Sequence, residues 1–145
     1  MNEQDTQTGI TGQFGARATV TIVRPRRMFV AVARENLRAV LQWLKDSLGY
    51  YHISTVTGLD SGENFEALYH VTDGNIEVTV RTSAPRTDPH LPTVTDILPG
   101  AILHERELQD MFGFVIDNHP DPRRYVLPED WPADVYPLRK EYKAE

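Results

Sequence analysis

The uneven distribution of proline along this 145-residue chain sets the strongest limit on its fold. Only Pro25 lies in the first part of the chain, and the other nine of the ten prolines fall between Pro85 and Pro137. Proline lacks a backbone N–H and fixes φ, so it is rare in helix interiors and in central strands. The sequence therefore predicts regular secondary structure in residues 1–84. Residues 85–145 are predicted to contain many turns and to lie over a surface.

The proline-poor part has the pattern of a sheet with one helix packed on it. Apolar stretches in residues 19–32 predict two strands, or one strand with an extended lead-in, around the basic cluster 24–27. We interpret that cluster as a solvated turn, with an anion site as the alternative. Between Glu35 and Leu48 apolar residues recur at helical spacing, and Gly49 follows where a left-handed cap belongs. Residues 50–58 are rich in β-branched and aromatic side chains and predict a further strand.

Asp73-Gly74 lies between two apolar runs of similar length and predicts a β-hairpin. This dipeptide favours the two-residue type I′ turn, which needs positive φ at both central positions. A two-residue loop fixes the register, so the apolar side chains of both strands share one face and polar side chains meet on the other. The predicted opposite pairs are Val71–Ile76, Tyr69–Val78, Ala67–Val80, His70–Glu77 and Glu66–Arg81.

Two segments next to this sheet carry weaker signals. Residues 1–16 are polar and contain glycine, and we expect a flexible N-terminus there. Ser83–Pro99 contains too many prolines for a central strand and predicts a long connector. Within this connector we expect a short helical turn near Thr93–Ile97 and an exposed His90.

Length and composition suit a single domain, because 145 residues with 40% hydrophobic side chains can bury one core. The expected fold is α+β, with a mostly antiparallel sheet packed with one long helix. A second helix and a proline-rich extended C-terminal tail follow. Residues 17–113 are expected to form the α+β domain, and residues 114–145, called the tail below, belong to the same domain.

Charge and cysteine content exclude several classes of protein. The chain has no cysteine, which excludes thiolate zinc sites, cysteine-bound iron–sulfur clusters and thiol nucleophiles. Its net charge of −6 argues against nucleic-acid binding. No apolar run reaches the roughly 18 residues that span a bilayer. The first residues lack the basic and apolar regions of a signal peptide, so we expect a cytoplasmic protein.

A helix predicted over residues 101–112 carries a carboxylate on its apolar face. At 100° per residue, Glu105 falls in one stripe with Leu108 and Phe112. Burying an unpaired charge is costly, so we expect an arginine of the tail to pair with Glu105. The alternative is a rotated helix with Glu105 at a solvated edge. The candidate arginines are Arg123, Arg124 and Arg139, and on another side of the helix Arg106 is expected to pair weakly with Asp110.

The same region allows a different class of function, a stand-alone enzyme or metal-binding protein. His104 and Glu107 lie three positions apart on the helix and could share a metal or act as an acid–base pair with Glu105. Asp110 and His119 could complete such a cluster. Such spacing is common by chance, and the chain has no H-E-x-x-H motif and no Gly-rich phosphate loop.

An ordered set of short motifs resembles the 30-kilodalton subunit family of respiratory complex I and its hydrogenase relatives. The resemblance extends over about residues 28–142. The departures are Tyr125, where the family has an aliphatic residue, and Pro122, where leucine is common. The motifs are ERE at 105–107, DMFG at 110–113, HPD at 119–121, RR at 123–124, LPEDW at 127–131 and YPLRK at 136–140, after the segments TVTGLD, FEALYHV, IEVTVRT and TVTDILPGA.

The resemblance implies a non-catalytic subunit that packs against a large catalytic subunit, of the complex I 49-kilodalton or hydrogenase type, beside an iron–sulfur subunit. It implies no cofactor on this chain, with iron–sulfur clusters, flavin or a nickel–iron centre on the partners. Membrane association would occur only through the complex, at the inner face of the cell membrane. The last part of the tail resembles the energy-converting hydrogenase and formate hydrogenlyase branch, which leaves open both the electron donor and the acceptor.

The resemblance also identifies candidate contacts with the partner, while no catalytic, cofactor or metal residue is expected. Aromatic residues and arginine are enriched at interface hot spots. For each apolar candidate the alternative role is packing in the chain's own core. Residues 85–145 carry 7 basic and 12 acidic side chains, a net −5, which predicts a partner surface of basic character. The candidates are Glu105, Arg106, Asp110, Met111, Phe112, His119, Arg123, Arg124, Trp131, Tyr136 and Arg139.

Overall fold

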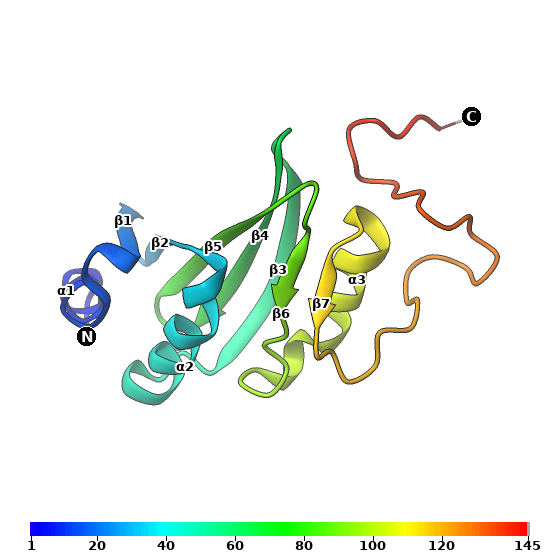
Figure 1. The fold of residues 1–145 in the computed structure, drawn as a ribbon. Coiled ribbons are helices and arrows are strands. Elements are labelled where there is room, and N and C mark those ends of the chain that lie inside the picture. The colour runs from blue at the N-terminus through cyan, green and yellow to red at the C-terminus, as the bar shows by residue number, and fades with distance from the viewer. Residues whose placement is uncertain (145) are drawn as a thin grey trace.

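The computed structural model describes residues 1–144 and shows a five-stranded sheet with helices and loops around it (Figure 1). The sheet order is β1-β2-β5-β4-β3, and every neighbouring pair is antiparallel except β2 and β5, which are parallel. The mostly antiparallel sheet of the predicted α+β fold is therefore confirmed. The strands are β1 (Ala18–Arg24), β2 (Arg27–Val32), β3 (His52–Asp60), β4 (Asn64–Thr72) and β5 (Glu77–Pro85).

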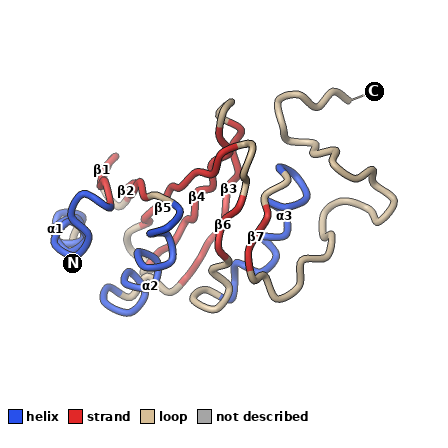
Figure 2. Tube along the Cα trace, in the orientation of Figure 1, coloured by secondary structure: helices blue, strands red, loops and turns tan. Residues whose placement is uncertain are grey.

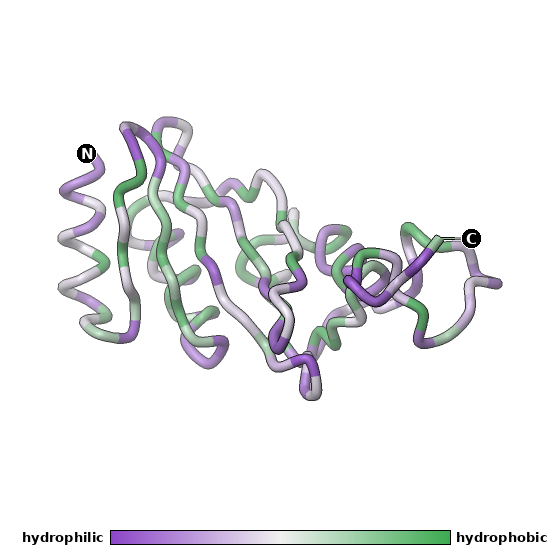
Figure 3. Tube along the Cα trace, turned by 90° about the horizontal axis from the view of Figure 1, so that it is seen from above, coloured by the Kyte–Doolittle hydropathy of each residue, from purple (hydrophilic) through white to green (hydrophobic). Residues whose placement is uncertain are grey.

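The two faces of the sheet differ in what covers them. Apolar and polar positions alternate along the strands (Figure 3). On β4 the side chains of Phe65, Ala67, Tyr69 and Val71 are fully buried on the face that forms the core. On the opposite face His70 bonds the hydroxyls of two threonines from the adjacent strands. One buried face and one polar face are the usual arrangement of an antiparallel sheet.

Helix α2 (Leu37–Leu48) packs on the core face and confirms the helix predicted between Glu35 and Leu48. A 3₁₀ turn over Arg34–Asn36 precedes it, and Gly49 ends it with φ +79°. The sequence predicts one long helix and a second helix, whereas the described residues hold three α-helices of 12, 12 and 11 residues. No helix is therefore distinctly long.

Residues 1–16, expected to be a flexible N-terminus, instead contain helix α1 (Glu3–Phe14). Asn2 and Asp5 form a capping box at its start, with the Asp5 N–H donating to Asn2 over 2.8 Å. Ile10 and Phe14 are buried, and the Phe14 ring packs edge-on against Trp43 of α2 at 5.7 Å between centroids. Helix α1 contains too few apolar residues for its sequence to show a helical pattern. The apolar side chains Ile10 and Phe14 are nevertheless both buried in the core.

The β4–β5 hairpin forms as predicted, but its register differs by two residues. Val71 pairs with Val78, where the two-residue loop predicted Ile76. The side chain of Asp73 accepts hydrogen bonds from the N–H groups of Asn75 and Ile76, both at 2.8 Å, and so builds a longer loop. A shift of two keeps every side chain on its predicted face. The observed opposite pairs are Val71–Val78, Tyr69–Val80, Ala67–Thr82, His70–Thr79 and Glu66–Ser83.

The connector holds a short strand, β6 (His90–Pro92), that pairs in parallel with β7 (Val115–Asp117). Between them, helix α3 (Ile102–Phe112) confirms the second predicted helix and ends at Gly113. It packs on the sheet at Gly58 of β3, where a Cβ would lie 2.3 Å from the Phe112 ring. A glycine is needed at this position because the helix approaches the strand so closely.

The tail begins with β7, continues as a loop and lies at the opposite end of the molecule from the N-terminus (Figures 1 and 2). Between residues 118 and 144 the described chain contains no helix and no strand. Backbone groups that lack regular hydrogen bonds must find other partners. The side chains that provide these partners form the candidate site.

Candidate partner-docking surface

The carboxylate of Asp110, on α3, holds the start of the tail. Its Oδ2 accepts hydrogen bonds from three successive backbone N–H groups, those of Tyr125 at 2.9 Å, Val126 at 2.8 Å and Leu127 at 3.1 Å. Asp110 is 7% exposed, so three donors compensate a nearly buried charge. The sequence predicted a weak pair between Asp110 and Arg106, and this prediction is wrong because the tail occupies both side chains.

Arg106 binds the same stretch of the tail from the preceding turn of α3. Its guanidinium donates to the carbonyls of Arg123 at 2.8 Å and Arg124 at 3.0 Å, and lies 3.5 Å from the carboxylate of Asp121. The Tyr125 ring covers it, with 5.5 Å from the guanidinium carbon to the ring centroid. Two adjacent tail carbonyls, which no strand partner satisfies, are thus bound by one planar side chain.

His119 joins the turn after β7 to the start of α3. Its Nε2 lies 3.0 Å from the carbonyl of Ile102, and the N–H of Asp121 donates to its Nδ1 over 3.0 Å. A carbonyl can only accept, so the ring must carry its proton on Nε2 and accept at Nδ1. Both ring nitrogens are therefore already used.

Arg124 and Trp131 shape the middle of the tail into a closed loop. The Arg124 guanidinium donates to the carbonyls of Pro128 at 3.0 Å, Glu129 at 3.1 Å and Trp131 at 2.6 Å. The Trp131 indole N–H donates to the carbonyl of Val135 over 2.8 Å. Because these contacts lie within the tail, they fix its shape.

Gly113 and Arg139 bind the end of α3 to the second half of the tail. Gly113 has φ +79°, and a Cβ there would lie 2.5 Å from Arg139 and 2.7 Å from Tyr136. Arg139 donates to the carbonyl of Phe112 over 2.6 Å and stacks on the rings of Tyr136 and Phe65, at 4.3 and 4.7 Å. Glycine is required here both for the left-handed backbone and for the close approach of the tail.

Asp60, at the end of β3, binds the backbone of the tail, and the sequence did not predict this contact. It accepts from the N–H of Lys140 at 2.9 Å and the N–H of Gly62 at 3.0 Å, and it pairs with Arg86. Burial acts to raise the pKa of Asp60, but these three donors outweigh it and lower the pKa to about 2. Arg86 also binds Glu141 at 3.0 Å. Nothing in the residues around Asp60 indicates a contact with a residue so distant in sequence.

The outward side of the tail presents apolar and charged side chains to solvent. Tyr125, Val126 and Leu138 are 49%, 45% and 53% exposed. A hollow of about 630 Å³ opens between the aromatic side chains of the tail, with the Trp131 and Tyr142 rings 6.2 Å apart. Of the apolar candidates, Phe112 is 5% exposed and belongs to the core, and Met111 is partly buried against it.

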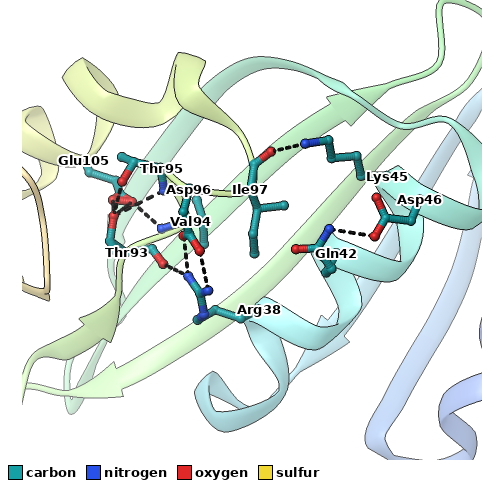
Figure 4. A network of polar contacts seen from close by, with 10 residues as sticks. All are labelled: Arg38, Gln42, Lys45, Asp46, Thr93, Val94, Thr95, Asp96, Ile97 and Glu105. Atoms are coloured by element: carbon teal, nitrogen blue, oxygen red, sulfur yellow. Dashed lines mark hydrogen bonds and ion pairs between the residues drawn. The ribbon is translucent and has the colours of Figure 1, made fainter.

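Glu105 has no arginine partner, so the predicted pair with Arg123, Arg124 or Arg139 is wrong. The alternative of a solvated edge is wrong as well, because Glu105 is 0% exposed. Its oxygens accept from the Thr93 hydroxyl, at 2.9 and 3.0 Å, and from the N–H of Val94 at 2.8 Å (Figure 4). Burial raises the pKa of Glu105 to about 7, against the hydrogen bonds from Val94 and Thr93 that lower it.

The candidate cluster for metal or acid–base chemistry is not assembled. Glu105 points into the core, Asp110 binds tail amides and both nitrogens of His119 are used. Within residues 1–144 no group of three or more His, Cys, Asp or Glu side chains is placed to hold a metal ion. In the same part of the chain, no helix is both long enough and apolar enough to cross a membrane.

Comparison with protein families matches residues 30–145 to the family described as respiratory-chain NADH dehydrogenase, 30 Kd subunit. The chain is 36% identical over 119 residues to a subunit of the NADH-quinone oxidoreductase of Acidothermus cellulolyticus, a match that covers 77% of this chain and 61% of the relative. It is 31% identical over 139 residues to a subunit of the F420H2 dehydrogenase of Methanosarcina mazei, covering 92% and 87%.

Among solved structures, the fold is similar to a chain of the membrane-bound sulfane sulfur reductase, an archaeal respiratory membrane complex. The TM-score is 0.79 at 24% identity, and the match covers 97% of this chain and 85% of that one. The first three curated relatives are longer proteins, of which this chain spans 46%, 61% and 42%.

Proposed function

This chain belongs to the family of the respiratory-chain NADH dehydrogenase 30 Kd subunit, and from that membership we propose that it is a non-catalytic structural subunit of a membrane-associated electron-transfer complex. It packs against the large catalytic subunit, of the 49-kilodalton or hydrogenase type, and lies beside an iron–sulfur subunit. Flavin, iron–sulfur clusters or a nickel–iron centre belong to those partners. The chain reaches the inner face of the membrane only through the complex.

The observation that carries this proposal is that the tail beyond β7, residues 118–144, contains no helix or strand, yet side chains of the same chain fix its shape. Asp110, Arg106 and Asp60 hold its backbone, while Tyr125, Val126 and Leu138 face solvent. Ordering a segment on binding costs affinity, and a segment already ordered avoids that cost. Exposed apolar side chains on a fixed scaffold are what a docking surface requires.

Charge indicates the chemistry of the partner surface. Glu129, Asp130 and Asp134 lie in the closed loop of the tail, and within the described residues none of them forms an ion pair. Arg124, which lies within this loop, donates to carbonyls and leaves these charges unpaired. A basic partner surface would complement them, and such complementarity acts mainly on association rate and specificity.

Two variants with one matched control test this function. Val126→Asp and Leu138→Asp place a charge on exposed positions of the tail, and Val23→Asp does the same on β1, where the side chain is also 50% exposed. A tagged wild-type chain should copurify with the large subunit from its own host. Both tail variants should reduce the recovered large subunit at least tenfold, a loss of about 1.4 kcal/mol, and V23D should not. Wild-type chain recovered without a large subunit would contradict the proposal.

The same preparation distinguishes the two branches of the family. A nickel–iron large subunit would select the hydrogenase branch, which the last part of the tail resembles. A quinone-reducing large subunit would select the branch of the NADH-quinone oxidoreductases, to which the chain is similar.

A further inference from the structure

Glu105 differs from the other buried carboxylates in the donors it receives. Asp110 accepts three N–H groups, Asp60 accepts two N–H groups and a guanidinium, and Glu66 accepts from the guanidinium of Arg81. Glu105 is 0% exposed and accepts one hydroxyl and one N–H, with no cation in contact. A buried carboxylate so weakly compensated favours its neutral, protonated form.

Three ionisable side chains face Glu105 from the elements packed against it. Tyr69 of β4 is fully buried, and its hydroxyl has no hydrogen-bond partner among residues 1–144. Asp96 of the connector adds a negative charge, which opposes ionisation of Glu105. Arg38 of α2 adds a positive charge, but both its terminal nitrogens bind the Asp96 carboxylate at 2.7 Å (Figure 4). The charged groups around Glu105 therefore stabilise its ionised carboxylate only weakly.

A line of hydroxyl groups joins this carboxyl to solvent. The Thr95 hydroxyl lies 2.8 Å from the Thr93 hydroxyl, which lies 2.9 Å from the nearer oxygen of Glu105. Thr93 and Thr95 both line an open hollow of about 640 Å³ beside the connector. A hydroxyl both donates and accepts, so it can receive a proton on one side and release another on the other side.

We propose that Glu105 is a proton-binding site inside the folded chain, reached from the hollow through the Thr95 and Thr93 hydroxyls. When Glu105 is ionised, Thr95 donates to Thr93 and Thr93 donates to the carboxylate. When a proton enters, each hydroxyl passes one proton inward and the line reverses, so that Glu105 donates to Thr93. The raised pKa of Glu105, at about 7, agrees with this geometry.

This site sits where α3 meets the connector, next to residues that bind the tail. Arg106 and Asp110 project from the same helix toward the tail, while Glu105 joins it to Thr93 and Val94. Uptake of a proton is therefore linked to the contact between α3 and the connector. The proposal concerns the single chain and holds or fails independently of any partner subunit.

A carbon NMR titration of the glutamate carboxyls in the full chain, with Glu105→Gln to assign the signal, tests the site directly. The Glu105 carboxyl should titrate about 1.5 pH units or more above the ordinary value of a glutamate carboxyl, about 4.3. A midpoint at or below that ordinary value would overturn the proposal.

Variants around the carboxyl should move its midpoint in opposite directions, which a merely structural role would not produce. Thr93→Val removes a donor to the ionised form and should raise the midpoint. Asp96→Asn removes a like charge and frees Arg38, so it should lower the midpoint. Asp46→Asn is the matched control on α2, because Asp46 binds Gln42 at 2.7 Å and does not contact the network around Glu105. Equal midpoints for T93V and D96N would overturn the assignment.

Thr95→Val tests the route separately from the site. It removes the outer hydroxyl but leaves the donors to Glu105 in place. The midpoint should stay unchanged while exchange of the carboxyl proton with solvent slows by about tenfold, seen as broadening of the Glu105 signal near its midpoint. Unchanged exchange in T95V would refute the route through the hydroxyls.

Discussion

The sheet and the tail are held in place by different kinds of interaction. The sheet is held by ladder hydrogen bonds and by a continuous apolar core in which Phe65, Tyr69 and Val71 are fully buried. The tail is held by single side chains that bind its backbone, chiefly Asp110 and Arg106. An apolar core distributes its stabilisation over many contacts, whereas each tail contact depends on one side chain.

This difference determines how each region should fail. Damage to the core should lower the free energy of unfolding of the whole domain, because the core unfolds as one unit. Damage to a tail contact should release the tail locally and leave the sheet protected from hydrogen exchange. Four changes separate these two outcomes.

The largest effect is expected from Gly58→Ala, where the sheet meets α3. The added Cβ would lie 2.3 Å from the Phe112 ring and 2.9 Å from Leu108, so the helix must move. We expect a loss of about 3 kcal/mol in the free energy of unfolding, measured by urea denaturation. The matched control is Gly12→Ala in α1, where nothing lies within 4 Å and a gain of about 1 kcal/mol is expected. Equal stability of the two variants would contradict close packing at Gly58.

The next effect is the pH dependence caused by Glu105 in the core. The pKa of Glu105 is raised from 4.5 to about 7 in the folded chain, so the folded state binds more protons than the unfolded state between these values. The contribution of Glu105 to stability is therefore fully present below pH 4.5 and falls, by about 3 kcal/mol, as the pH rises to 7. Urea denaturation across this range should show the fall in the wild type and its absence in E105Q. A fall of the same size in E105Q would assign it to another group.

Sequence periodicity predicted the elements whose neighbours along the chain determine their structure. The helix at Glu35–Leu48 carries a continuous apolar stripe and ends at a glycine, and both features are local. Helix α1 was missed because its buried side chains, Thr6, Ile10 and Phe14, are separated by polar residues and glycine. The hairpin register was missed because the Asp73 side chain, not the dipeptide alone, builds the loop.

The contacts of the candidate site were predicted less well, because they join residues of this chain that are distant in sequence. We expected an arginine beside Glu105 because a buried charge needs a partner of opposite charge. A neutral carboxyl can be buried with only a hydroxyl and an N–H as hydrogen-bond partners. Arg124 and Arg139 were named as contacts for a partner because arginine is enriched at interface hot spots, and that role stays a prediction. In a segment without helix or strand, free carbonyls of the same chain take those guanidiniums first.

Asp60 should give the opposite pH dependence to Glu105, because it holds the tail as a charged group. Its pKa is lowered from 3.8 to about 2 in the folded chain, so it stabilises the fold above pH 3.8. That contribution, about 2 kcal/mol, is lost as the pH falls toward 2. Between pH 4 and pH 2 the wild type should therefore lose about 2 kcal/mol more than Asp60→Asn in denaturation experiments. If the free energy of unfolding fell equally with pH in the two proteins, the charged contact between Asp60 and the tail would be contradicted.

Asp110→Asn is expected to have the smallest effect on the free energy of unfolding. It should have the clearest effect on the hydrogen exchange of a few tail amides. An amide oxygen can still accept from the tail, but the three N–H groups lose a charged acceptor, which costs about 1.5 kcal/mol. Hydrogen exchange should speed up about tenfold at Tyr125, Val126 and Leu127 while the amides of β4 keep their protection. Asp134→Asn, on an exposed tail carboxylate without an ion pair among the described residues, should change neither. If D110N exposed the sheet amides as much as the tail amides, the tail would be part of the cooperative core, and the division between the two regions would be wrong.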